Sequence, residues 1–211
     1  MSMSLFPDGS LDDPSPTSPK DLNLAALAKK AAACTACTLS SSRTCSVFSS
    51  GPSSSKVILL GEAPGANEDA SGRPFCGASG RLLDEILDQV GLPRSSVYVC
   101  NAIKCRPPQN RPPTPLEIST CRPFLVEQLD LINPVLIITL GSSALRALGV
   151  EFKSLSTLRG KILSHGGRNV LPTVHPAYVL RRRNIERPGF VKDLTLAAEI
   201  INSQSPDRSE S

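Results

Sequence analysis

The chain has 211 residues, of which 40% are apolar, and its formal net charge is +4. This length suits one domain with a sizeable core, and no apolar run reaches the ~20 residues that a membrane-spanning helix needs. The first twenty residues hold three aspartates and no apolar signal-peptide segment, so we expect a cytoplasmic protein that is not secreted. The mild positive charge permits an anionic partner without demonstrating one.

Ser, Pro and Asp dominate residues 1–20 and 203–211, and both segments are expected to be disordered tails. The folded domain is then expected to span residues 21–202. Helices are expected at 21–33, 79–90, 114–131, 142–149 and 187–202, and strands at 57–60, 97–99, 135–140 and 169–174. This alternation predicts an α/β fold with three α/β/α layers, in which helices cover both faces of a parallel sheet.

Polar side chains follow each of the expected strands. Glu62 follows the first strand, Asn101 the second, Ser142 the third and His175 the fourth. Ligands of open α/β sheets bind beyond the carboxyl ends of the strands. We therefore expect these four side chains to converge on one crevice.

Two pairs of cysteines have the spacing of metal ligands. Cys34 and Cys37 form a CxxC pair, and Cys105 and Cys121 form a wider one around a proline-rich segment. Four thiolates suit either a structural zinc ion or a [4Fe–4S] cluster. The alternative is that these are buried free thiols.

A glycine-rich stretch, GEAPGANEDASGRPFCG, occupies residues 61–77. It lacks both the Lys-Ser/Thr ending of a P-loop and the GxGxxG spacing, which argues against nucleotide binding. Its notable side chains are Glu62, Glu68, Asp69 and Phe75. A solvated acidic loop, with Phe75 as an anchor to the core, is the alternative to a functional site.

The segment TVHPAYVLRRR, residues 173–183, places a histidine between a strand and a run of arginines. A lone histidine is more often structural than catalytic, and charged runs are often solvated faces. Arg181–Arg183 with Arg187 would nevertheless suit a phosphate backbone. The only other histidine, His165, is expected at the surface.

These motifs, taken in order, resemble the uracil-DNA glycosylase superfamily, and within it the iron–sulfur family four. The matching segments are GEAPGANED at 61–69, GRPFCG at 72–77, NAIKCRPPQNR at 101–111, TPLEISTCRPFL at 114–125 and HPAYVLR at 175–181. The resemblance covers residues 22–201. It implies a four-stranded parallel sheet, a [4Fe–4S] cluster and the hydrolytic removal of uracil from single- or double-stranded DNA during base excision repair.

The resemblance also assigns the cluster ligands. They are Cys34, Cys37, Cys105 and Cys121, with zinc as the less favoured metal. Cys45, Cys76 and Cys100 are left without a role as ligands, and Cys100 is expected in the core.

The chemistry of uracil removal gives roles to further residues. The base must be flipped out of a duplex or met in a single strand. One amide, assigned to Asn101, complements the uracil N3–H donor and O4 acceptor and rejects cytosine, while Phe75 stacks on the base. His175 donates a hydrogen bond to the O2 of the leaving uracil, joined by backbone N–H groups of residues 61–65.

The residue that activates water is less defined. Related enzymes carry an aspartate where this chain has Ala63, so the nearest carboxylates are those of Glu62 and Glu68. We expect leaving-group stabilisation to dominate, with one of these two positioning water or the sugar. Asn110, in the proline loop, is a further candidate for contact with the substrate.

The segment after His175 is expected to meet DNA. Leu180 is the favoured wedge into the duplex, Arg181 a phosphate contact and Tyr178 a further contact. The matching loop has no histidine of the kind that traps product covalently in one relative, so turnover is expected.

Two rival functions remain possible from the sequence. One is a metal-stabilised DNA-binding module without hydrolysis, and the other is an unrelated zinc protein. In the favoured hypothesis the chain is a monomer that acts on uracil-containing DNA near the nucleoid, without membrane contact. The proline-rich segment at 104–121 is expected to be ordered by the metal, because stiff loops lose less entropy on closure.

Overall fold

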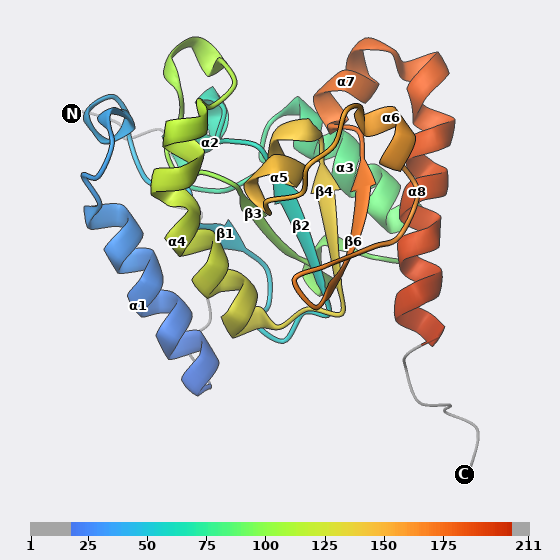
Figure 1. Ribbon diagram of the computed structural model, residues 1–211, viewed down its shortest axis with the longest axis horizontal. Coiled ribbons are helices and arrows are strands. Elements are labelled where there is room, and N and C mark those ends of the chain that lie inside the picture. The colour runs from blue at the N-terminus through green and yellow to red at the C-terminus, as the bar shows by residue number, and fades with distance from the viewer. Residues whose placement is uncertain (1–17, 204–211) are drawn as a thin grey trace, which may run out of the picture.

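The computed structural model describes residues 18–203. Of the tails expected at 1–20 and 203–211, residues 1–17 and 204–211 lie outside the described residues. At its centre is a six-stranded sheet in the order β1-β3-β2-β4-β6-β5 (Figure 1). The strands are β1 (Ser49–Ser50), β2 (Val57–Gly61), β3 (Tyr98–Asn101), β4 (Leu136–Leu140), β5 (Leu163–His165) and β6 (Arg168–Thr173). The inner four pair in parallel, and β1 and β5 add antiparallel edges.

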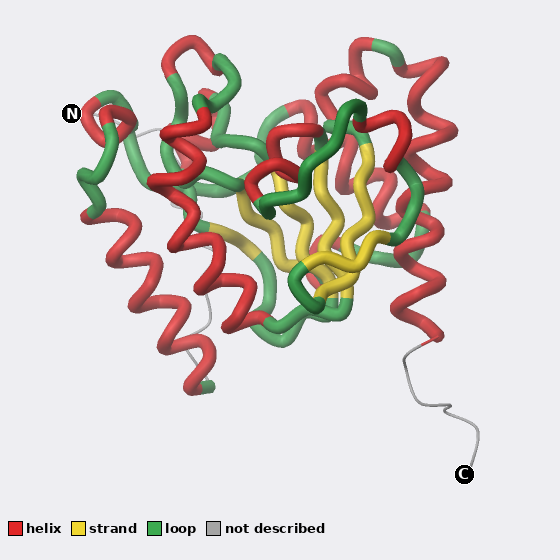
Figure 2. Tube along the Cα trace, in the orientation of Figure 1, coloured by secondary structure: helices red, strands yellow, loops and turns green. Residues whose placement is uncertain are grey.

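Helices cover both faces of this sheet (Figure 2). The α-helices are α1 (Pro19–Ala33), α2 (Ala66–Ser71), α3 (Ala78–Gln89), α4 (Pro115–Ile132), α5 (Ser142–Ala147), α6 (Leu155–Leu158), α7 (Pro176–Arg181) and α8 (Arg183–Ser203). Three 3₁₀ turns are η1 (Thr38–Ser41), η2 (Arg94–Ser96) and η3 (Pro108–Asn110). Helices α4 and α5 pack on one face, with α1 outside α4, and α3 and α8 pack on the other.

The strand side chains alternate between two cores, as the pleat requires. Val57 and Leu59 of β2 face the core formed with α3 and α8. Ile58 and Leu60 face the core formed with α4 and α5. Because β2 is covered on both faces, it reads in the sequence as a continuous apolar run.

The α/β class expected from the sequence is confirmed, with a correction to the sheet. The parallel pairing applies to the inner strands, but the sheet is mixed because of β1 and β5. These edge strands are two and three residues long, too short to leave a pattern of alternating hydrophobicity. None of the described helices is long and apolar enough to cross a membrane.

Helix boundaries depart from expectation at capped ends. The expected N-terminal tail is too long, because Ser18 caps α1 and accepts a hydrogen bond from the Asp21 backbone N–H. Helix α4 runs through Pro123 without a break. It starts at a capping box, in which Thr114 and Glu117 accept each other's backbone N–H.

Candidate active site

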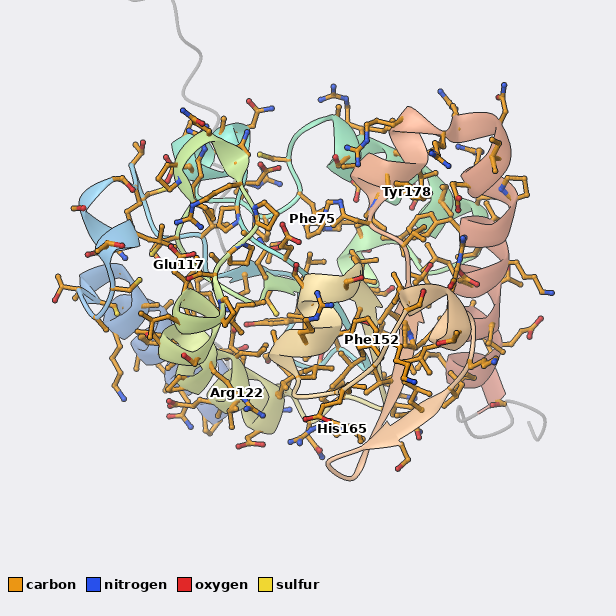
Figure 3. All side chains as sticks on the ribbon, turned by 45° about the horizontal axis from the view of Figure 1, so that its top comes forward. Phe75, Glu117, Arg122, Phe152, His165 and Tyr178 are labelled. Carbon is orange, nitrogen blue, oxygen red and sulfur yellow. The ribbon has the colours of Figure 1, made fainter. Side chains whose placement is uncertain are left out.

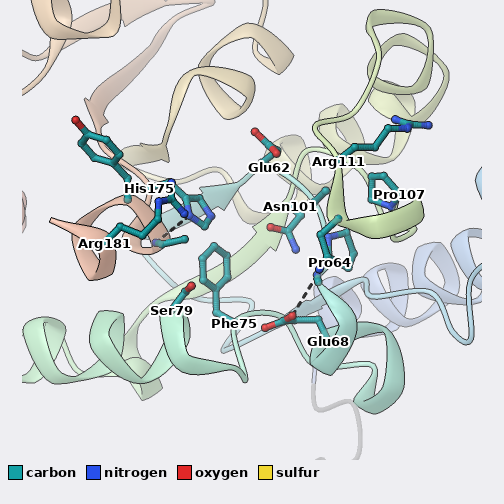
Figure 4. Close-up of a pocket in the computed structure, with 15 residues that line it drawn as sticks. Glu62, Pro64, Glu68, Phe75, Ser79, Asn101, Pro107, Arg111, His175 and Arg181 are labelled. Carbon is teal, nitrogen blue, oxygen red and sulfur yellow. Dashed lines mark hydrogen bonds between the residues drawn. The ribbon is translucent and has the colours of Figure 1, made fainter. Parts of the chain in front are cut away.

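The loops that follow β2, β3 and β6 enclose a cavity of about 540 Å³ at the carboxyl ends of the parallel strands (Figure 4). The cavity is lined by Glu62, Ala63, Pro64, Gly65, Glu68, Phe75, Ser79, Asn101, Pro107, Asn110, Arg111, His175, Ala177, Tyr178 and Arg181. Three of the four residues expected to converge are therefore together. Ser142 is the exception: it opens α5 and does not line this cavity.

Asn101 ends β3 with its side chain in the wall of the cavity. It is 2% exposed, yet its Oδ1 atom has no hydrogen-bond partner among the described residues. An unpaired buried polar atom costs free energy comparable to a lost hydrogen bond. A Cβ on Gly61 would lie 2.2 Å from this oxygen and 2.5 Å from the Phe75 ring, so only glycine at 61 permits the arrangement.

Phe75 reaches the cavity through a strained backbone. Its φ angle is +55°, a region that bulky residues rarely adopt. A Cβ on Gly80 would lie 1.6 Å from the Phe75 carbonyl oxygen, which explains the glycine in the first turn of α3. The Phe75 ring is 5.7 Å from the His175 ring between centroids, with a 31° interplanar angle. Phe75 is 7% exposed, so it both anchors the loop and lines the site.

His175 caps helix α7, and this fixes its tautomer. The His175 Nδ1 accepts a hydrogen bond from the Ala177 backbone N–H at 3.1 Å. Burial, together with the positive charge of Arg181, lowers the pKa of His175 from 6.5 to about 4. At neutral pH the imidazole is therefore neutral, and its proton is on Nε2, the nitrogen left free to donate.

The two candidate carboxylates differ in their surroundings. Both oxygens of Glu68 accept backbone hydrogen bonds at 3.1 Å, one from Gly65 and one from Gly77. Glu68 thus braces the loop that carries Phe75. The Glu62 carboxylate makes no hydrogen bond or ion pair with any residue that the structure describes, and it lines the cavity.

The proline-rich loop is held in place beside the cavity. Arg111 makes a two-pronged contact with the Glu117 carboxylate, at 2.8 and 2.6 Å. Hydrogen bonding from Arg111 lowers the pKa of Glu117 to about 2. Asn110 has φ of +55° and accepts from the Arg106 Nε at 2.7 Å. The sequence did not predict the Arg111–Glu117 ion pair, although Glu117 is recognisable in it as the glutamate of the α4 capping box.

Helix α7 forms another wall of the cavity. Tyr178 and Arg181 line it, whereas Leu180 does not and is 36% exposed at the surface. The expected cationic run is partly neutralised, because Arg183 and Arg187 form ion pairs with Glu85 of α3. Arg181 has no ion-pair partner among the described residues.

The four expected ligand cysteines line a second, smaller pocket. Cys34 follows α1, Cys37 precedes η1, Cys105 follows β3, and Cys121 lies in α4. All are free thiols. Arg43 donates a hydrogen bond to the Cys105 sulfur at 2.9 Å. The sequence had not predicted a role for this arginine. Across residues 18–203, no three His, Cys, Asp or Glu side chains are grouped closely enough to hold one metal ion.

The remaining cysteines and the second histidine make other contacts. Cys100 is fully buried in the core, as expected. Cys45 donates to the Asp69 carbonyl oxygen, and Cys76 hydrogen-bonds with the Ser71 hydroxyl. The His165 Nε2 is 3.0 Å from the Leu148 carbonyl oxygen, and Figure 3 shows it well away from Phe75 and Tyr178.

Comparison with known proteins agrees with this geometry. The model of the uracil DNA glycosylase superfamily matches residues 48–197. A type-4 uracil-DNA glycosylase of Thermotoga maritima is 43% identical over 175 residues, 81% of this chain and 91% of the relative. One of Archaeoglobus fulgidus is 38% identical, over 82% and 90%. The chain therefore belongs to the uracil DNA glycosylase superfamily, in its type-4 group.

A more distant relative is also similar. A type-5 uracil-DNA glycosylase of Thermus thermophilus is 32% identical over 166 residues, covering 69% of this chain and 74% of the relative. The superfamily match begins just before β1 and ends within α8. It therefore includes every loop that lines the 540 Å³ cavity.

Proposed function

We propose that the chain hydrolyses the N-glycosidic bond of uracil in DNA and leaves an abasic site. The observation that carries this proposal is the buried, unpaired Oδ1 of Asn101 facing a cavity that also holds Phe75 and a neutral His175. The relatives named above are uracil-DNA glycosylases, which supports the same activity here.

Base recognition is assigned to Asn101 and Phe75. The Asn101 Oδ1 accepts the N3–H of uracil, and its amide nitrogen donates to O4. Cytosine has an acceptor at N3 and a donor at the neighbouring position, so it would leave both amide groups mismatched. The Phe75 ring stacks on the flipped base, and Phe75, Asn101 and His175 lie together in the cavity wall (Figure 4).

Stabilisation of the leaving group is assigned to His175. As the glycosidic bond breaks, negative charge develops on uracil O2, and the sugar acquires oxocarbenium character. The neutral His175 donates from Nε2 to O2, and its orientation is already set by the bond from Ala177. Backbone N–H groups of the loop at 61–65, including that of Ala63, join this stabilisation.

The hydrolytic water is assigned to Glu62. Of the two candidate carboxylates, Glu62 is free to bind water and to face the cationic sugar, while both Glu68 oxygens are bound to backbone N–H groups. Glu68 contributes by fixing the loop, and Asn110 by closing the cavity from the proline loop. This division of roles revises the sequence-based hypothesis, which treated the two glutamates alike.

Contact with DNA is assigned to helix α7. Arg181 meets a phosphate, Tyr178 borders the entering nucleotide, and Leu180 supplies the apolar wedge. The catalytic unit would be the folded domain, which was expected at 21–202 and starts at Ser18 in the structure. It would act as a monomer in the compartment that holds the DNA, and the tails would lie outside it.

The four cysteines of the second pocket are proposed to hold a [4Fe–4S] cluster. Thiolates of such a cluster bind different iron atoms and stand farther apart than the ligands of one zinc ion. The four cysteines around one pocket supply the number and type of ligands that such a cluster requires. When bound, it would cross-link α1, η1, the loop after β3 and α4.

One assay tests the proposed function. Purified protein with its native metal is incubated with a uracil-containing oligonucleotide, and abasic sites are detected as alkali-labile breaks. Cleavage at uracil and not at cytosine in the same sequence is expected. An intact, metal-loaded preparation that binds the oligonucleotide without cleaving it would instead support a DNA-binding module, and stoichiometric zinc in a colourless protein would exclude the cluster.

A further inference from the structure

A lysine lies in the core between the two pockets. Lys104 is 1% exposed, and its Nζ donates to the Asn101 carbonyl oxygen at 2.7 Å and to the Gln128 Oε1. The residue also lines the cysteine pocket, directly before Cys105. A buried ammonium is costly unless it is paired and hydrogen-bonded, so its position calls for a physical reason.

No carboxylate among residues 18–203 pairs with this ammonium. The buried acidic residues are engaged elsewhere: Asp69 by the Thr44 backbone, Glu117 by Arg111, and Asp193 by Arg159. The sulfurs of Cys100 and Cys121 lie within electrostatic reach of the Lys104 side chain, and Cys121 lines the same pocket as Lys104. Thiolates bound to a [4Fe–4S] core keep a net negative charge, so the occupied cysteine pocket would supply the missing counter-charge.

On its other side, the Lys104 ammonium contacts the main chain of Asn101. Strand β3 leaves the sheet here, since the pairing of β3 with β2 ends at Gly61 and Asn101. The Asn101 carbonyl oxygen accepts from the Lys104 side chain at this exit point. The bond from Lys104 thus fixes the backbone from which the Asn101 amide enters the cavity. Gln128 of α4 accepts from the same ammonium and donates to the Tyr98 hydroxyl at 3.0 Å, but it does not contact Asn101.

We propose that Lys104 is a positioning residue that couples the cysteine pocket to uracil recognition. Held between the cluster thiolates and the Asn101 carbonyl, its ammonium keeps residue 101 in the orientation that presents Oδ1 to the base. Lys104 itself does not line the 540 Å³ cavity that holds Asn101, Phe75 and His175, which we call the base cavity. The inference rests on the proposed function, because it concerns the same recognition site.

The test uses the full, metal-loaded chain and the variant Lys104→Met, which keeps the length of the side chain and removes its donors. Free uracil is titrated calorimetrically, and cleavage of uracil and cytosine is compared in one oligonucleotide. Because hydrogen bonds from charged groups are among the stronger ones, we expect uracil to bind about tenfold more weakly or worse. We also expect reduced preference for uracil over cytosine and faster loss of iron to a chelator.

Two control variants separate positioning from general stability. Lys29→Met removes an exposed lysine of α1, and should leave all three readouts unchanged. Gln128→Met removes a buried partner but leaves the Lys104 bond to Asn101, so it should lower thermal stability and retain uracil affinity. If Lys104→Met does not fold, Lys104→Gln, which keeps a polar group at the site, replaces it.

The outcomes are distinguishable from those of the proposed function. A wild-type protein that neither binds nor cleaves uracil would refute that function, whatever Lys104 does. An active wild type together with a Lys104 variant of unchanged uracil affinity and selectivity would overturn the coupling. Weaker uracil binding and poorer discrimination in Lys104→Met, without either effect in Gln128→Met, would establish it.

Discussion

The two pockets are built in different ways from the same chain. The base cavity lies where the loops after three parallel strands meet, and the Asn101 Oδ1 in its wall is buried without a partner among the described residues. The cysteine pocket lies off the sheet, between α1, η1, the loop after β3 and α4. One site is positioned by the sheet, and the other must be positioned largely by what its cysteines bind.

The two pockets should therefore respond differently when the group that each of them binds is absent. The base cavity is held by glycines that let side chains approach, by Glu68 and by the cap at His175, so it should persist without ligand. The segments around the cysteines are joined by a small apolar cluster of Leu39, Ile103 and Cys105, and by the bonds from Arg43 to Cys105 and to the Ala32 carbonyl oxygen. We therefore expect metal loss to disturb the cysteine pocket first, and the following experiments test this contrast.

The largest effect is expected from Cys121→Ser. Removal of one thiolate should abolish the brown colour and the iron and sulfide content, and residues 104–121 should become sensitive to protease, because metal binding and folding are linked. Digestion followed by mass spectrometry locates the cuts. Cys45→Ser is the matched control, since serine can still donate to the Asp69 carbonyl oxygen. Unchanged protease resistance in iron-free Cys121→Ser would contradict the contrast.

The next largest effect concerns the base cavity. His175→Ala should lower the single-turnover rate of uracil excision by about 10²–10³-fold, the typical cost of removing one such donor. The fold should survive, since the change touches a side chain that caps a six-residue helix. His165→Ala, outside the cavity, should keep the wild-type rate. Equal rates for the two variants would refute the role of His175.

The protonation of His175 gives a second check on the same residue. Its pKa of about 4 means that the ring stays neutral as pH falls through the ordinary value of 6.5. Its contribution to stability is full above pH 6.5 and is lost as pH falls toward 4, because the unfolded chain binds the proton first. The chain has two histidines, so NMR of the imidazole signals, assigned with His175→Ala, measures this directly.

The sequence predicted the parts that follow from periodicity and strand topology. Asn101 and His175 could be placed together because parallel strands end at one edge. The same rule wrongly predicted that Ser142 lines the cavity. The end of a strand does not indicate in which direction the following helix runs. The burial of Lys104 leaves no local signal, because its partner Gln128 is distant in the chain. The strain at Phe75 leaves none either, because the residue type does not indicate a positive φ.

The proline loop lies between the two pockets, and its attachment gives a medium effect. Glu117→Gln should lower the free energy of unfolding by about 2 kcal/mol at pH 7, through loss of a charged, two-pronged bond from Arg111. The folded-state pKa of Glu117, about 2, is below its ordinary 4.5. Its contribution is thus present above pH 4.5 and lost as pH falls toward 2, so the variant and wild type should converge there.

Urea unfolding at pH 7 and pH 3 measures this convergence. Glu127→Gln changes an exposed carboxylate of the same helix and should have little effect at either pH. A Glu117→Gln defect that stays constant between the two pH values would show that the side-chain charge is not its source. The same variant should loosen the wall of the base cavity at Asn110, seen as a higher KM for uracil DNA.

The smallest effect separates Arg181, on the wall of the base cavity, from Arg187, which lies outside it. Arg181 lines the cavity without an ion-pair partner among the described residues, whereas Arg187 is bound to Glu85 at 2.9 Å. If Arg181 neutralises one phosphate, Arg181→Gln should reduce the slope of log K against log salt for duplex binding by about 0.9. Arg187→Gln should leave the slope unchanged and cost less than about 1 kcal/mol of stability, as exposed pairs do. Fluorescence anisotropy with a labelled abasic-site duplex, repeated across salt concentrations, measures the slope for both variants. Equal slopes for Arg181→Gln and Arg187→Gln would mean that the DNA backbone binds to the overall positive charge of α7 and α8, and not specifically to Arg181.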